Sequence, residues 1–88
     1  MPGITRNSGQ DAAGGANIEG SSNVFANNNP VVRVGDLVAG HGTGAHASPV
    51  MASGSANVFT NNNKTCKAGD IASCGHPSSG SNDVFVND

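Results

Sequence analysis

One short phrase occurs three times in this chain, at residues 20–27, 54–61 and 80–87. The three copies share a Gly-Ser start, a Val-Phe pair and a final Asn. The protein has three phenylalanines and no tryptophan or tyrosine, and each phenylalanine stands at the same place in the phrase. A phrase repeated in this way predicts one structural unit that is stacked or rotated several times, so the rest of the chain has to join three similar units.

The first phrase opens a predicted β-hairpin. Residues 23–26 form a short β-branched and aromatic run, which is typical of a strand. The three asparagines at 27–29 predict a tight turn, because Asn accepts positive φ more readily than other non-glycine residues. Residues 30–34 are the expected return strand. Pro30 is its first residue, where a missing N–H does least harm, and a Gly-Asp pair ends it.

The second phrase opens a close copy of this hairpin. Phe25 and Phe59 are 34 residues apart, and so are Asp36 and Asp70. The expected second return strand is 64–68. Nowhere does the chain show helical periodicity over about 11 residues, the window that such an assignment needs. We therefore expect an all-β fold of short hairpins and long loops, forming a single domain over residues 1–88.

A chain of this composition needs more than an apolar core to fold. At 88 residues, folding buries roughly 60–65% of the unfolded surface, which is a thin margin. Only 35% of the residues are hydrophobic, and 13 glycines add backbone entropy that opposes folding. Some further constraint is expected, whether a disulfide, a metal or a partner. With two cysteines and no signal sequence, a disulfide framework is not expected.

Charge and hydropathy exclude several classes of partner. The net charge is −2 and 11% of residues are charged, so no basic patch is available for nucleic acid. No run approaches the roughly 18 apolar residues of a membrane span. Residues 1–6 lack the apolar core of a signal peptide, so the protein is expected to be made in the cytoplasm without one.

The loops that follow the two Gly-Asp pairs hold all three histidines and one cysteine: His41, His46, Cys74 and His76. Zinc takes Cys and His in four-coordinate structural sites, and metal binding in a small domain contributes directly to folding. Cys74 and His76 are separated by one residue, so an extended segment puts both on one face. The glycine-rich bend between His41 and His46 lets both turn inward. We predict a zinc site with these four ligands. Iron is the alternative metal, since imidazole and thiolate suit it too.

Cys66 is the competing sulfur donor. The repeat offset places it at the position of Val32 on a return strand, where a small buried hydrophobe is the natural role. A partial ligand set completed by Cys66, a carboxylate, water or another chain remains an alternative at this point.

Two other interpretations of the three histidines and Cys74 explain these residues less well. Solvated surface histidines would explain one His, but not three with a cysteine in equivalent loops. A Cys/His pair or an open metal site can serve catalysis. Against this, the chain has little apolar bulk to form a substrate pocket. Glu19 is its only glutamate, and Asp36 and Asp70 are expected in turns. We expect no enzyme activity.

The repeated phrase, the Asn turn and the run Pro30-Val31-Val32-Arg33 before Val34-Gly35-Asp36 together resemble the PAAR-repeat proteins. That family is named for a Pro-Ala-Ala-Arg run at the place of residues 30–33. The second unit carries Lys64-Thr65-Cys66-Lys67 there, and residues 2–6 resemble the end of a worn copy, with Arg6, Gly9 and Asp11 as its traces.

The resemblance implies a small conical fold of three pseudo-threefold hairpin repeats, whose loops converge on a metal-bound vertex. It implies a structural, membrane-piercing tip for the trimeric β-helical spike of a contractile injection machine, with one copy per spike trimer. Members of the family often place one ligand histidine in the N-terminal loop. Residues 10–15 contain none here, so His76 would be the replacement.

On this interpretation the Val-Phe pairs supply the base of the cone and its inner packing. Phe25, Phe59 and Phe85 are expected to form a core cluster rather than exposed anchors. The residues assigned to the base are Val24, Phe25, Val58, Phe59, Val84 and Phe85.

The rival role is an adaptor that links effector cargo to the spike of a type VI secretion system. In this family that role usually goes with an extra domain at one end, which this sequence does not show; this favours the plain tip. The expected location is the virion, at the tip of the tail baseplate spike. The alternative is the tip of a secreted, type VI-like apparatus. A free metal-binding module is a third class, but it would need no threefold repeat.

Overall fold

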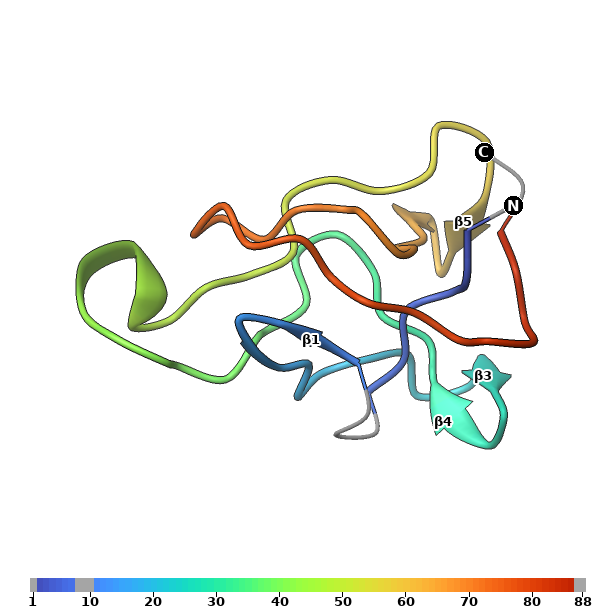
Figure 1. Cartoon of the computed structure of the whole chain (residues 1–88). Helices are drawn as coiled ribbons and strands as arrows, with labels where there is room; N and C mark the ends of the chain where they lie inside the picture. The colour runs from blue at the N-terminus through green and yellow to red at the C-terminus, as the bar shows by residue number, and fades with distance from the viewer. Residues whose placement is uncertain (1, 8–10, 87–88) are drawn as a thin grey trace.

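The computed structural model describes residues 2–7 and 11–86, and it is built from very short strands joined by long loops (Figure 1). Within these residues, three two-stranded antiparallel sheets form, each a hairpin. The same part of the chain holds one 3₁₀ helix, η1, in the loop between β4 and β5. No helix in the described part of the chain is long and apolar enough to cross a membrane. The all-β prediction is confirmed. The elements are β1 (Ala12–Ala13), β2 (Gly15–Ala16), β3 (Phe25–Ala26), β4 (Asn29–Pro30), η1 (Gly44–His46), β5 (Phe59–Thr60) and β6 (Asn63–Lys64).

The asparagine clusters form the hairpin turns, but with two residues rather than three. Asn27 and Asn28 have φ of 54° and 65°, as the two central residues of a type I′ turn require. Asn61 and Asn62 repeat this with 52° and 69°. The third asparagine of each cluster already belongs to the return strand, because two residues suffice for a turn whose twist matches that of the strands.

The third copy of the repeat is not one of these three sheets. Its two strands pair without a turn, because the two ends of the chain supply them. Gly3 pairs with Phe85 as Pro30 pairs with Phe25. The Ile4 amide donates to the Val84 carbonyl at 2.8 Å, as the Val31 amide does to Val24 at 3.0 Å. The sequence predicted only that residues 2–6 resemble the end of a worn copy. The pairing shows that this segment is the return strand of the third repeat. Asn87, the last residue of the third phrase, lies outside the described residues.

The three return strands meet on a common axis. The Val32 amide donates to the Thr5 carbonyl at 3.0 Å, Cys66 to Val32 at 2.9 Å, and Thr5 to Cys66 at 3.0 Å, which closes a ring of three equivalent residues. All three are fully buried. Cys66 thus takes the buried position of Val32, as the repeat offset predicted. The expected strand over 30–34 is wrong in its pairing: only its start belongs to its own hairpin, because the later residues pair with neighbouring repeats.

A clamp of one cation and one aspartate ends each return strand. In each, the carboxylate accepts the backbone N–H of the cationic residue as well as its side chain. In two of them Gly35 and Gly69, with φ of 97° and 94°, make the tight turn between the partners. Arg6 and Asp11, which in the sequence were only traces of a worn copy, form the first clamp. The side-chain distances are 2.8 Å in Arg6–Asp11, 2.9 Å in Arg33–Asp36 and 2.9 Å in Lys67–Asp70.

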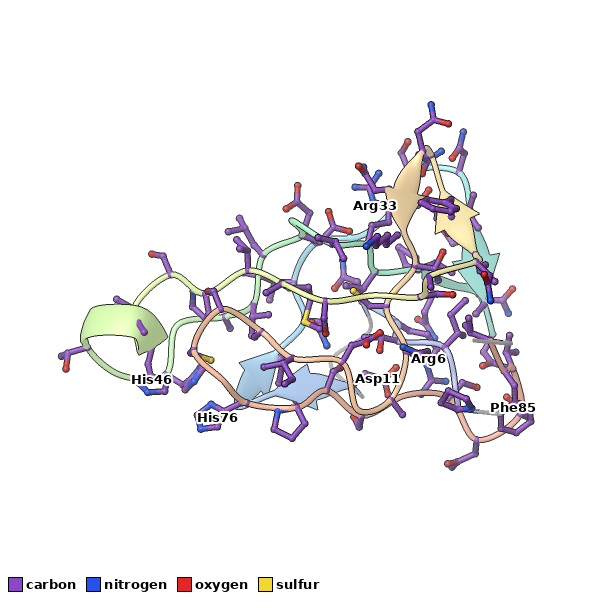
Figure 2. All side chains as sticks on the ribbon, turned by 90° about the horizontal axis from the view of Figure 1, so that it is seen from above. Arg6, Asp11, Arg33, His46, His76 and Phe85 are labelled. Atoms are coloured by element: carbon purple, nitrogen blue, oxygen red, sulfur yellow. The ribbon has the colours of Figure 1, made fainter. Side chains whose placement is uncertain are left out.

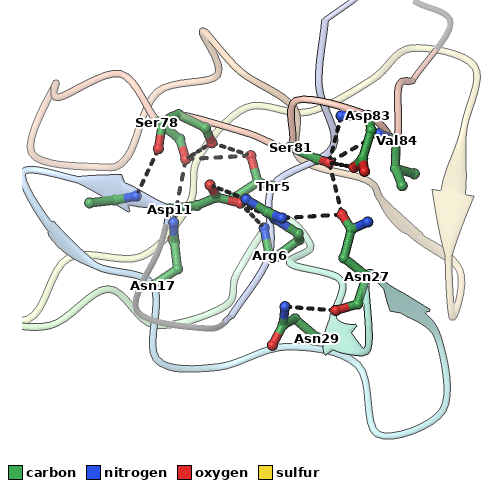
Figure 3. A network of polar contacts seen from close by, with 12 residues as sticks. Thr5, Arg6, Asp11, Asn17, Asn27, Asn29, Ser78, Ser81, Asp83 and Val84 are labelled. Carbon is green, nitrogen blue, oxygen red and sulfur yellow. Dashed lines mark hydrogen bonds and ion pairs between the residues drawn. The ribbon is translucent and has the colours of Figure 1, made fainter.

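The clamps also hold neighbouring repeats together through the turn asparagines (Figure 3). The Asn27 side-chain oxygen accepts Arg6 Nη1 at 3.1 Å and the Ser81 hydroxyl at 2.9 Å. In the next repeat, Asn61 accepts Arg33 Nη1 at 3.3 Å and the Ser21 hydroxyl at 2.6 Å. One asparagine therefore makes a hairpin turn and fastens that hairpin to the repeat beside it.

The phenylalanines do not form the expected core cluster. Phe25, Phe59 and Phe85 are 54%, 55% and 48% exposed. Side chains alternate across a strand, and the residue after each phenylalanine points inward instead. These inward residues are Ala26, Thr60 and Val86, each at most 5% exposed. Small side chains suit the inner face, because three hairpins converge there and leave little room. Val24 is exposed, and Val58 and Val84 are half-buried.

The buried core lies further along the axis, between the hairpins and the long loops. Its members are small and aliphatic, and several occupy the second position after a clamp aspartate. Figure 2 shows the molecule narrowing from the hairpin end, where Phe85 lies, to the loop end with His46 and His76. The extents of 32 × 24 × 22 Å agree with a short cone. The core residues are Ala13, Val32, Val38, Met51, Cys66 and Ala72.

Candidate metal centre

Four side chains from two equivalent loops meet at the narrow end. His41 follows the second clamp, and η1 places His46 five residues later. Cys74 and His76 come from the loop after the third clamp, where Gly75, with φ of 92°, turns the chain between them. All four are partly buried, and one donor atom from each lies within 4.8 Å of the others. The structure brings together the whole set of ligands proposed from the sequence.

His41 is the centre of the cluster. Its Nε2 lies 3.1 Å from Nδ1 of His46 and 3.0 Å from Nδ1 of His76. The Cys74 sulfur lies 3.7 Å from His41 Nε2 and 3.5 Å from His76 Nδ1. The three rings are tilted to one another with centroids 4.9–5.0 Å apart, so their edges rather than their faces converge.

A backbone carbonyl orients the central ring. His41 Nδ1 lies 3.1 Å from the Ala39 oxygen. A carbonyl can only accept, so Nδ1 carries the proton and the Nε2 lone pair faces the other donors. Metal-bound histidines commonly donate their second ring N–H in this way, which fixes the tautomer and the ring orientation. Sequence reasoning missed this contact, and Ala39 carries no signal that would have revealed it.

The donor set fits a tetrahedral ion. Bonds of about 2.0–2.1 Å to nitrogen and 2.3 Å to sulfur put tetrahedral ligands roughly 3.3 Å apart for N···N and 3.6 Å for S···N. Four of the six donor–donor separations, the N···N contacts of 3.0 and 3.1 Å and the S···N contacts of 3.5 and 3.7 Å, lie close to these edges, and all donors are within 4.8 Å of one another. Three imidazoles and a thiolate would hold the ion, and the ion would supply cross-links between two loops that no disulfide joins.

Cys66 takes no part in this cluster. It is fully buried in the core, with its Sγ 3.5 Å from the Ser53 carbonyl oxygen. Burial raises the pKa of the Cys66 thiol to about 12, and the nearby Asp70 carboxylate adds to the shift. A thiol that keeps its proton is a poor metal ligand. The alternative of Cys66 as a completing ligand therefore finds no support in the geometry.

Charge is concentrated away from the donors, in the three clamps. Hydrogen bonds from Arg6 to Asp11 and from Arg33 to Asp36 raise the pKa of each guanidinium. At the broad end the Ser81 hydroxyl lowers the pKa of Asp83, with Asn27 adding to the effect.

The serine of each repeated phrase fixes the start of its hairpin. Ser81 and its equivalents Ser21 and Ser55 each accept hydrogen bonds from two backbone N–H groups. Their place in the repeated phrase was the signal for this role.

The fold and the site define a class: a small all-β protein of three hairpin repeats, with a His/Cys cluster able to hold a metal at its narrow end. The family model of the PAAR motif matches residues 9–78, most of the chain. The protein belongs to the PAAR-motif family and is a PAAR-type spike-tip protein of contractile injection systems. No curated protein matches the chain.

Proposed function

We propose that this protein is the membrane-piercing tip that caps the trimeric central spike of a contractile injection machine, as in a phage tail baseplate. A zinc ion held by His41, His46, Cys74 and His76 sharpens and stiffens its vertex. It works mechanically, without enzyme activity. In this role it stands at the tip of the baseplate spike in the virion.

The observation that carries the proposal is the difference between the two ends. Three equivalent hairpins form the broad end, and each presents one half-exposed phenylalanine. The donor cluster lies at the opposite, narrow end (Figure 2). A threefold base and a cross-linked point are what a tip on a trimeric spike requires.

The broad end suits a trimeric β-helical partner. Such a spike ends in three exposed sheet edges, which invite unwanted pairing unless they are covered. One chain with three similar hairpins offers each edge a nearly equivalent surface, so one copy serves the whole trimer. Phenylalanine rings that are half exposed in the free protein contribute to affinity when a partner buries them. Val24, Val58 and Val84 precede them and complete the proposed contact surface.

The narrow end suits zinc. A set of four protein ligands with no open position is typical of structural zinc sites. Zinc has no redox chemistry, so the site would stay intact outside the cell, whereas iron remains the alternative for the same donors. The described residues enclose no pocket in which a substrate would lie.

Docking is tested with the trimeric spike protein encoded in the same genome. We expect one tip per spike trimer by light scattering and native mass spectrometry. Replacing Phe25, Phe59 and Phe85 together with Ser should abolish the complex. The control replaces Leu37 and Ile71 with Ser, since these are 43% and 45% exposed but lie beyond the clamps. Loss of binding in the control alone, or three tips per trimer, would contradict the proposal.

One observation favours the adaptor role as a second candidate. Ile18 and Leu37 are 53% and 43% exposed on neighbouring segments, and the Ile18 amide donates to the Leu37 carbonyl at 3.1 Å. This aliphatic pair lies outside the hairpin base, where a single cargo protein of a type VI system would find room. An effector that binds the chain and is released by Leu37→Ser would promote this candidate.

A further inference from the structure

In the part of the N-terminal loop that the structure describes, residues 11–17, no side chain joins the metal cluster, yet this segment lies directly against it. Gly14, between β1 and β2, has φ of 85°. A Cβ at this position would lie 2.6 Å from Nε2 of His41 and closer still to Nδ1 of His76. Those two nitrogens are 3.0 Å apart. A methyl group at residue 14 would therefore enter the space that the donor nitrogens share.

Gly15 packs along the other edge of the same ring. A Cβ there would lie 3.0 Å from Nδ1 of His41 and would collide with the Ala39 carbonyl oxygen. This is the carbonyl that orients His41. The Ala39 amide in turn donates to Ala16 of β2 at 2.8 Å. The backbone of Gly14 and Gly15 thus lies along both edges of the His41 imidazole. A side chain at either position would collide with the ring or with the carbonyl that orients it.

We propose that Gly14 determines metal binding: the lack of a side chain at this position keeps the space between the donor nitrogens open for the ion. The inference rests on the proposed metal site and assigns it a residue that is not a ligand. Two repeats join the site by ligation and the third joins it by close packing.

This arrangement links the ion to all three repeats. The β1–β2 hairpin begins next to Asp11, the carboxylate of the first clamp, and the Asn17 amide closes the hairpin on the Asp11 carbonyl at 3.1 Å. A side chain at residue 14 would push the β1–β2 hairpin away from the donors, and this hairpin is anchored by the first clamp. The metal would therefore hold the N-terminal repeat in place without a ligand from it.

The test compares Gly14→Ala with Gly35→Ala. Gly35 has φ of 97°, a Cβ there meets nothing within 4 Å, and it lies in a clamp away from the donors. Both variants carry similar backbone strain, and only the first fills the metal space. By chelator competition with zinc, Gly14→Ala should lose about 10- to 100-fold in affinity, as removal of supporting contacts at metal sites does. Gly35→Ala should keep a zinc affinity near that of wild type.

A further variant separates steric intrusion from misfolding. The chain is short enough for chemical synthesis with D-alanine at position 14, which accepts positive φ and places its methyl group on the other side of Cα. We expect near wild-type zinc affinity for this chain. Equal zinc affinity in wild type and Gly14→Ala, or a D-alanine chain as weak as Gly14→Ala, would overturn the inference alone. A wild-type chain that binds no zinc would overturn the proposed metal site with it.

Discussion

The broad end and the narrow end of this protein use the same repeat in opposite ways. At the broad end each repeat contributes the same parts: a Val-Phe strand, a return strand, a clamp and one residue of the buried ring. At the narrow end the repeats differ, with two histidines from one loop, a cysteine and a histidine from another, and glycines from the third. Symmetry is kept where a threefold partner would bind, and abandoned where a single ion needs four ligands.

This difference has a physical reason. A tetrahedral site has four ligand positions, which three identical loops cannot supply equally. Backbone pairing has no such restriction, so hairpins and clamps can recur unchanged around the axis. Substitutions at either end, or on the axis between them, should therefore differ in their effect on stability, and the narrow end should be the most sensitive.

Removing the metal should have the largest effect. Structural zinc contributes on the order of 10 kcal/mol in small peptides, and the apolar core here is small. We expect Cys74→Ser, or chelation at neutral pH, to lower the melting temperature far more than Cys66→Ser, which costs about 1–2 kcal/mol by burying a hydroxyl. Calorimetry with metal analysis checks this. A reversed order of the two serine variants would break the assignment of the narrow end.

High pH should destabilise the buried ring on the axis, through the Cys66 thiol. The pKa of the Cys66 thiol is raised to about 12 in the folded chain, from an ordinary value of 9.0. The thiol of the unfolded chain therefore ionises first as the pH rises. Below about pH 9 this ionisation does not change the free energy of unfolding. Between pH 9 and 12 it lowers the free energy of unfolding by about 1.4 kcal/mol per pH unit.

Urea denaturation from pH 8 to 11 measures this loss, with Cys66→Val as the control because valine occupies the equivalent position 32. The stability of wild type should fall more steeply with pH than that of the variant. Parallel curves would show that Cys66 is not buried in the folded state.

Breaking one clamp should cost about 2 kcal/mol, the value typical of hydrogen bonds to charged groups. Arg33→Ala removes both bonds to Asp36 and the contact with Asn61, and leaves a carboxylate that is 5% exposed without its cation. Lys64→Ala removes an exposed cation from the same region and should change stability by less than about 0.5 kcal/mol. Urea unfolding of both variants gives the comparison, and equal losses would remove the structural role of the clamp.

Among the side chains assigned a role, Phe59 should contribute least to the stability of the free protein, as Phe59→Ala would measure. The ring is 55% exposed, so its removal should cost less than about 1 kcal/mol rather than the roughly 3 kcal/mol of a core phenylalanine. Chemical denaturation of the isolated chain measures it. A loss near the larger value would place the ring in the core after all, and would take away the reason for assigning it to a partner.

Local chemistry explains which features the sequence predicted well. The Asn pairs adopt positive φ because of their own side chains, and the Gly-Asp pairs turn because glycine permits it. The repeat offset correctly placed Cys66 in the core, since equivalent positions in a repeat have equivalent surroundings. The clustering of His41, His46, Cys74 and His76 followed from their place in equivalent loops.

The sequence determined the repeat, its turns and the four donors, because these depend on residues near one another along the chain or on the period itself. The tertiary structure alone decided which face of each short strand is inside, and so turned the phenylalanines outward in favour of Ala26, Thr60 and Val86. It also decided that residues 2–6 complete the third hairpin, and that Gly14 lies against the donors. These outcomes depend on how three units close around one axis. The repeat period and local propensities do not predict this packing around the axis, because it brings together residues that are far apart in the chain.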